Sequence, residues 1–197
     1  MNLRKHPGLV RSAALLLSLI AIWTAHPAPA LATEAAWARV ASGGYTILLR
    51  HGRTNAPNDP PSAEIGDCAT QNNLSDRGRQ QASRIGARFA ARATPISRVY
   101  TSEFCRTIET ADLAFRSAPV EELPGLNPLD DDIEDEIAVL RDLVDSFAGP
   151  GNQVVISHPE NIRALLGNEP REGEAVILAS SGDEGGDPVI VGRILLD

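Results

Sequence analysis

The stretch YTILLRHG, residues 45–52, decides how the fold of this chain is predicted. Residues 45–49 form a short apolar run rich in residues that favour β-structure, which indicates a buried strand. Arg50, His51 and Gly52 follow directly. His51 would then lie at the carboxyl end of this strand, which is where ligands bind in open α/β sheets.

Five later segments have the composition of strands. Residues 97–100 and 153–156 are clear β-type runs, and a shorter strand is expected near Val120. Residues 175–179 and 189–196 flank a Gly/Asp-rich link and predict a terminal pair of strands. The strand at 153–156 ends at Ser157-His158-Pro159, so a second histidine is also expected at the carboxyl end of a strand.

Helical patterns separate these strands. Ser75 is a suitable N-cap for a helix that extends to about Arg92. Ser102 is expected to cap a second helix, which carries Arg106 in its early turns. A third helix has an acidic start and would bury Ile137, Leu140 and Leu143, and a fourth follows His158 to Leu166. The alternation predicts an α/β fold: a three-layer αβα sandwich with a largely parallel central sheet.

The chain begins with the pattern of a secretory signal peptide. Basic residues precede an apolar run at 13–23, and a Pro/Ala segment then offers Ala30 and Ala32 as an A-x-A cleavage site. We therefore predict a signal peptide at 1–32, one globular domain at 33–197 and a periplasmic or secreted location. The apolar run is shorter than the roughly 20 residues of a membrane-spanning helix, so no stable membrane anchor is expected after cleavage.

Composition restricts the classes of partner and cofactor. Removing residues 1–32 takes three of the 18 basic residues and none of the 26 acidic ones, so the formal charge changes from −8 to −11. Such a chain is poorly suited to general binding of nucleic acid. Only His51 and His158 remain of the four histidines, too few for a di-metal site, and no metal or other cofactor is expected. Cys68 and Cys105 are predicted to form a disulfide.

Four segments together resemble a known family. They are LLRHGRT (residues 48–54), LSDRGRQQA (74–82), TSEFCRT (101–107) and VVISH (154–158). In this order they are similar to the histidine phosphatase (phosphoglycerate mutase-like) superfamily. Within this superfamily the chain resembles small exported members similar to the lipopolysaccharide core heptose phosphate phosphatase. These usually have an arginine where this chain has Asn72.

The resemblance implies a function and a set of site residues. His51 would attack phosphorus and form a phosphohistidine that water hydrolyses, while Arg50, Arg106 and His158 hold the phosphoryl oxygens. The substrate would be a small exported or envelope phosphomonoester, with sugar phosphates among the candidates. Arg53 and Asn161 are candidate substrate contacts.

Two questions stay open at this level. The acid that protonates the leaving group is expected to be Glu160, two residues after His158, with Asp130 and Glu103 as alternatives. The alternative function is a catalytically inactive member of the same fold that binds phosphorylated ligands. The loop at 55–73 and the segment at 121–131 would carry specificity, and the Cys68–Cys105 bridge would hold the loop beside the helix of Arg106.

Overall fold

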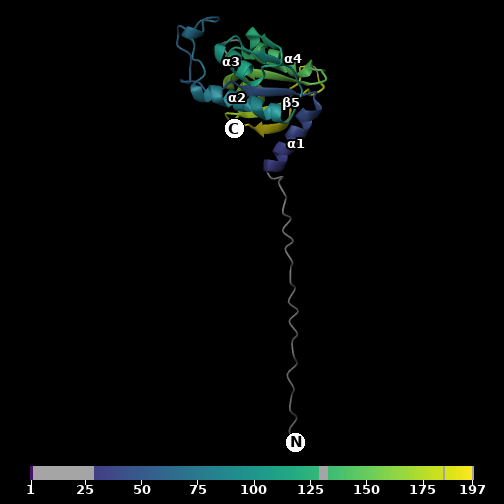
Figure 1. Ribbon diagram of the computed structural model, residues 1–197. Coiled ribbons are helices and arrows are strands. Elements are labelled where there is room, and N and C mark those ends of the chain that lie inside the picture. Colours follow the sequence, from purple (N-terminus) through teal and green to yellow (C-terminus); the bar gives the residue numbers. More distant parts are fainter. Residues whose placement is uncertain (2–28, 129–132, 184, 197) are drawn as a thin grey trace.

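The computed structural model describes Met1 and residues 29–196, apart from residues 129–132 and 184. Within this part of the chain, six strands form one sheet in the order β3-β2-β4-β1-β5-β6 (Figure 1). The strands are β1 Thr46–Arg50, β2 Ile96–Thr101, β3 Val120–Glu122, β4 Asn152–Ser157, β5 Glu174–Ala179 and β6 Val189–Leu195. Strands β3, β2, β4 and β1 are parallel, whereas β5 and β6 are added antiparallel, which confirms the predicted sheet.

Helices cover both faces of this sheet. The α-helices are α1 Pro29–Ser42, α2 Asp76–Ala91, α3 Cys105–Ala114, α4 Ile133–Asp145 and α5 Pro159–Leu166, with short 3-10 turns η1 Cys68–Thr70 and η2 Pro124–Leu126. Side chains alternate along β1, so that Ile47 and Leu49 face one side and Leu48 the other. The three predicted layers follow from this alternation.

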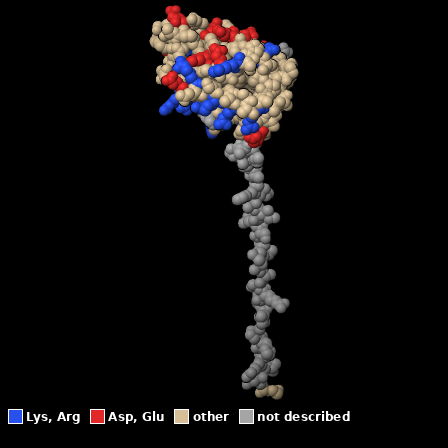
Figure 2. Space-filling model, in the orientation of Figure 1, with Lys and Arg blue, Asp and Glu red and all other residues tan. Residues whose placement is uncertain are grey.

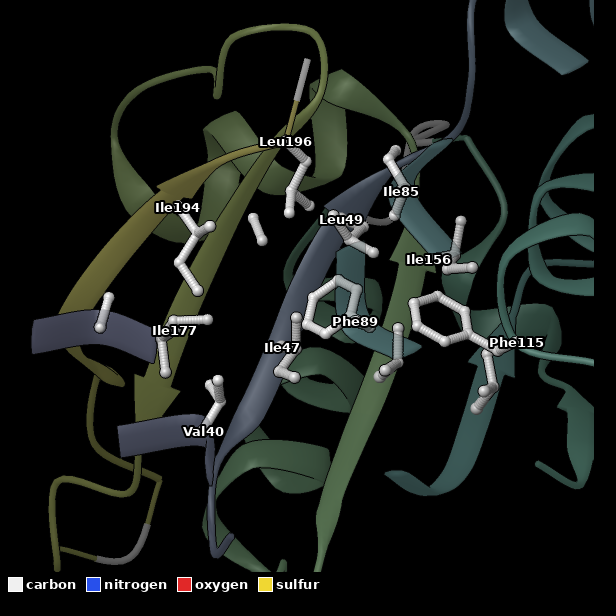
Figure 3. Packing of buried hydrophobic residues seen from close by; sticks show 14 of the residues in the cluster. Val40, Ile47, Leu49, Ile85, Phe89, Phe115, Ile156, Ile177, Ile194 and Leu196 are labelled. Carbon is white, nitrogen blue, oxygen red and sulfur yellow. The ribbon is translucent and has the colours of Figure 1, made fainter. Parts of the chain in front are cut away.

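The first face of the sheet is packed by α1, α2 and α3. Ile47 and Leu49 contact a cluster that includes Phe89 of α2 and Phe115 at the end of α3 (Figure 3). Each such fully buried side chain contributes roughly 1.5–3 kcal/mol through loss of contact with water. The second face is packed by α4 and α5, where Leu140 is the most deeply buried side chain of α4.

Helix α1 was not expected from the sequence. It extends across the predicted cleavage point before Thr33, and its Trp37 and Val40 are buried in the first core. A chain that begins at Thr33 would keep both side chains. Residues 2–28 of the predicted signal peptide lie outside the described residues, and none of the helices described could cross a membrane.

The helix starts agree with the sequence in two places and differ in one. Ser75 caps α2 by accepting a hydrogen bond from the Gly78 amide at 3.1 Å, and Pro159 occupies the first turn of α5. The prediction that Ser102 caps the next helix is wrong. Helix α3 starts later, with Phe104 at its N-cap, and the Ser102 hydroxyl lies 2.8 Å from Nε2 of His158.

Candidate active site

Two neighbouring parallel strands bring the two histidines together. Arg50, the last residue of β1, lies opposite Ser157, the last residue of β4. The backbone amide of His51 donates to the Ser157 carbonyl oxygen at 3.1 Å. As a result the rings of His51 and His158 lie 5.3 Å apart between centroids, as their positions in the sequence predicted.

The hydrogen bonds of His51 fix its tautomer. Nδ1 lies 2.8 Å from the carbonyl oxygen of Gly52, and because a carbonyl can only accept, Nδ1 carries the proton. Among the described residues Nε2 has no hydrogen-bond partner, and the ring lines a cavity. Burial lowers the pKa of His51 to about 4, so the ring is neutral near pH 7 and Nε2 has an available lone pair.

His158 is held in the opposite tautomer. Arg106 Nη2 lies 3.1 Å from its Nδ1, and a guanidinium can only donate, so Nδ1 accepts. Nε2 therefore carries the proton and donates to Ser102 Oγ at 2.8 Å. Burial, together with the charge of Arg106, holds the pKa of this fully buried histidine well below its usual value.

Arg106 connects the histidines to the loop at 55–73. Its side chain is only 6% exposed, and Nη1 contacts both carboxylate oxygens of Asp59, at 2.8 and 3.1 Å. Burial lowers the pKa of Arg106, while the Asp59 carboxylate opposes this shift. The guanidinium also lies 4.6 Å from the centre of the Phe104 ring, which fixes its plane.

A cavity of about 640 Å³ opens beside His51, and both arginine and glutamate side chains line it. Arg50 donates to Glu169 at 2.9 Å, and Arg163 pairs with the same carboxylate at 3.6 Å. Arg53 forms an ion pair with Glu172. Each of the cavity's arginines, Arg106 included, thus has a carboxylate partner from a loop.

The three candidate acids differ in their positions. Glu160 lies in the first turn of α5, is half-buried and lines the cavity. Glu103 accepts a hydrogen bond from Asn127 Nδ2 at 2.9 Å and does not line this cavity. Asp130 lies outside the described residues.

The two candidate substrate contacts, Arg53 and Asn161, differ in whether they line the cavity. Arg53 lines the cavity, whereas Asn161 is fully buried, does not line it and donates to the Asn127 carbonyl oxygen at 2.7 Å. The structure therefore gives no support to a substrate contact for Asn161. Asn72 lines the cavity, and its side-chain amide forms two hydrogen bonds with the backbone of Ala56.

The loop at 55–73 is attached to α3 at several points. The predicted disulfide between Cys68 and Cys105 is present, and Gln71 Oε1 accepts a hydrogen bond from the Cys105 amide at 2.9 Å. Cys105 is the first residue of α3, directly before Arg106. The loop and the arginine are therefore positioned as one unit.

Sequence reasoning missed four residues of the site. Asp59, Glu169 and Glu172 lie in loops with no periodic pattern, and only the fold brings them to the arginines. Ser102 precedes a helical pattern, which predicts a helix cap and gives no sign of its hydrogen bond to His158. The described residues contain no group of three or more His, Cys, Asp or Glu side chains that could hold a metal ion.

Comparison of the sequence with known families gives a match over part of the chain. Residues 46–130 match the sequence model of the histidine phosphatase superfamily (branch 1). No curated protein has a significantly similar sequence.

Solved structures share the fold at low sequence identity. Phosphoserine phosphatase from Entamoeba histolytica, in complex with 3-phosphoglyceric acid, is 18% identical, with a TM-score of 0.55 over 76% of this chain and 96% of that one. YhfR from Bacillus stearothermophilus is 17% identical, with a TM-score of 0.55 over 75% and 95%. The protein histidine phosphatase SixA complexed with tungstate is 21% identical, with a TM-score of 0.54 over 77% and 96%.

Proposed function

We propose that this chain is a member of the histidine phosphatase superfamily, whose sequence model residues 46–130 match, that it hydrolyses phosphomonoesters and that His51 is the nucleophile. One observation carries this proposal. The Gly52 carbonyl fixes the proton on Nδ1 of His51 and leaves Nε2 unprotonated on the wall of the cavity, beside His158 and Arg106. A neutral imidazole held in this way is prepared for in-line attack on phosphorus.

The reaction would have two steps. In the first, Nε2 of His51 forms a bond to phosphorus, the bond between phosphorus and the ester oxygen breaks, and Glu160 gives its proton to the leaving oxygen. In the second, water gives a proton to Glu160 and attacks the phosphohistidine. Inorganic phosphate leaves, and His51 and Glu160 return to their starting states.

Arg50, Arg106 and His158 would hold the phosphoryl oxygens. In the unliganded protein the Nδ1 atom of His158 accepts from Arg106, so it can donate to a phosphoryl oxygen only after it gains a proton. A bound dianion favours this protonation, because it offsets the unfavourable charge of a buried imidazolium. We therefore propose that Nδ1 of His158 gains a proton when the substrate binds and then donates a hydrogen bond to a phosphoryl oxygen.

The phosphoryl group would also compete with Asp59. The Asp59 carboxylate occupies Nη1 of Arg106, where it provides the same type of oxygen ligand as a phosphate. Substrate binding would exchange one anion for another at Arg106. The buried guanidinium therefore has an anionic partner in both states, which avoids the energetic penalty of an unpaired buried charge.

We further propose that the protein acts outside the cytoplasm on a small phosphorylated substrate. The predicted signal peptide and the Cys68–Cys105 disulfide support this location, because disulfides persist in oxidising compartments. The resemblance to the heptose phosphate phosphatase supports a sugar phosphate as one candidate.

The test is hydrolysis of an aryl phosphate by the wild type and by His51→Ala, with folding checked by thermal unfolding. We expect the variant to fold and to lose the activity, and we expect excess EDTA to leave the wild type unaffected. Rapid quenching with a radiolabelled substrate should trap an acid-labile, alkali-stable phosphoryl group on the wild type. Equal activity of the two proteins would overturn the proposal, and phosphate binding without any turnover would favour the inactive binding member.

A further inference from the structure

A second pocket lies next to the catalytic cavity and is lined by basic and amide side chains. It has a volume of about 370 Å³ and is formed by Arg53, Arg77, Gln80, Gln81 and Arg84. We call it the α2 pocket. Residues 77, 80, 81 and 84 of α2 are three or four positions apart, so they form a single face of the helix.

Two of the three arginines that line the α2 pocket, Arg77 and Arg84, have no carboxylate partner in the part of the chain that the structure describes. Among the described residues, the side chains of Arg77 and Arg84 form no hydrogen bond or ion pair, although the chain has 26 acidic and only 18 basic residues. The arginines of the catalytic cavity are all paired with carboxylates. Figure 2 shows basic side chains gathered where α2 crosses this face in Figure 1.

The α2 pocket and the catalytic cavity share a wall. Arg53, two residues after His51, lines both of them. Gly52 and Gly78 permit this close approach, because a side chain at Gly78 would collide with the backbone of Arg53. Gln81 also accepts from the Arg53 amide at 3.1 Å, which fixes the start of α2 against the turn after His51.

We propose that the α2 pocket binds a second anionic group on the leaving group of the substrate. The inference rests on the proposed function, in which one phosphoryl group is held by Arg106 and the histidines. A phosphomonoester that extends past Arg53 would bring a distal phosphate or carboxylate to Arg77 and Arg84. Guanidinium groups bind both anions through paired hydrogen bonds. The substrate class is therefore a phosphomonoester with a second anion.

The test compares substrates that differ only at the far end. Butyl phosphate and hexyl phosphate carry one anion, butanediol and hexanediol bisphosphates carry a second phosphate, and the phosphate ester of hydroxybutyrate carries a carboxylate. In the wild type we expect a higher kcat/KM for the doubly anionic compounds of suitable length. Replacing both Arg77 and Arg84 by Gln should lower kcat/KM for the preferred doubly anionic compound about tenfold, as expected for two exposed charge pairs, and leave butyl phosphate within about twofold.

Arg88→Gln is the matched control, since it removes the same charge from an exposed position on α2 that does not line the pocket. It should leave the preference for a second anion intact. The bisphosphate and hydroxybutyrate compounds distinguish a distal phosphate from a distal carboxylate. The preference should also fall when sodium chloride is raised from about 0.05 to about 0.5 M, because exposed charge pairs are screened.

Calorimetric titration with butane bisphosphonate and butyl phosphonate, which are not hydrolysed, separates this inference from the proposed function. If the wild type binds the bisphosphonate more tightly than butyl phosphonate, and the Arg77→Gln/Arg84→Gln variant does not, the α2 pocket is supported as a site for a second anion. This result would hold even if the protein hydrolysed no phosphate ester. If both phosphonates bind equally to the wild type, or if the double variant weakens both equally, the α2 pocket is not a site for a distal anion. If Arg88→Gln also lost the preference for substrates with a second anion, the assignment of that preference to the α2 pocket would be overturned.

Discussion

Replacing Asp59 by Asn should make phosphate bind more tightly. The Asp59 carboxylate contacts Nη1 of Arg106 at 2.8 Å, at a guanidinium that we assign to the phosphoryl group. An incoming dianion must displace this carboxylate or lie close to it. In the wild type, Asp59 also accepts a hydrogen bond from the backbone amide of Asn72 at 2.7 Å. An Asn side chain at this position can still accept from both Arg106 and Asn72, but it has no negative charge.

The size of the effect follows from the repulsion that is removed. Two unit charges about 5 Å apart interact by roughly 3 kcal/mol at an effective dielectric constant of about 20 and by less than about 1 kcal/mol in water. Asp59 is 19% exposed, so the environment lies between these limits. An intermediate value of about 1.4 kcal/mol corresponds to a tenfold decrease in the inhibition constant of inorganic phosphate.

The assay is competitive inhibition of aryl phosphate hydrolysis by inorganic phosphate. Asp67→Asn is the control, because Asp67 belongs to the same loop but accepts a hydrogen bond from the Ala69 amide at 3.0 Å, away from Arg106. The control should bind phosphate like the wild type. If Asp59→Asn binds phosphate as weakly as the wild type, or more weakly, then Asp59 orients Arg106 and does not compete with the substrate.

Three further predictions concern the acid, the nucleophile and the disulfide. Glu160→Gln should slow alkyl phosphates by roughly 10²–10⁴-fold and aryl phosphates far less, because only poor leaving groups need the proton, and Glu103→Gln should show no such contrast. Since burial lowers the pKa of His51 to about 4, the decline of kcat/KM that comes from protonation of His51 should appear only as the pH falls toward 4, and an acid-side decline centred at 6.5 would contradict the neutral nucleophile. Replacing Cys68 and Cys105 by Ser should lower the free energy of unfolding in urea by something like 3–4 kcal/mol, as expected for a closed loop of 37 residues, and an unchanged midpoint would refute this.

Much of the fold could be predicted because its strands and helices have strong local patterns. The apolar run before Arg50 and the run before Ser157 are buried strands, and the Ser75 cap and Pro159 mark helix starts that the structure contains. Helix α1 was missed because a Pro/Ala segment next to an apolar run is also typical of a signal peptide. Its burial depends on contacts with β6, a strand that is distant from α1 in the sequence.

The site could be predicted only in part, for a related physical reason. The sequence places His51 and His158 at strand ends, and parallel pairing then brings them together. The carboxylate partners of the arginines come from loops without periodic structure, so no local pattern identifies Asp59 or Glu169. The hydroxyl of Ser102 could have capped a helix or bound an imidazole, and only the path of the chain decides between these.

The attachments of the loop at 55–73 determine how an entering substrate can change the cavity. Exchange at Arg106 would release only Asp59, while the Cys68–Cys105 bridge and the hydrogen bond from Cys105 to Gln71 stay in place. The carboxyl-terminal half of the loop would therefore remain fixed to α3, and movement would be confined to the segment around Asp59. The entrance would widen by a local adjustment of one side, at a small cost in ordering entropy, and the molecule would not need to open and close as a whole during each turnover.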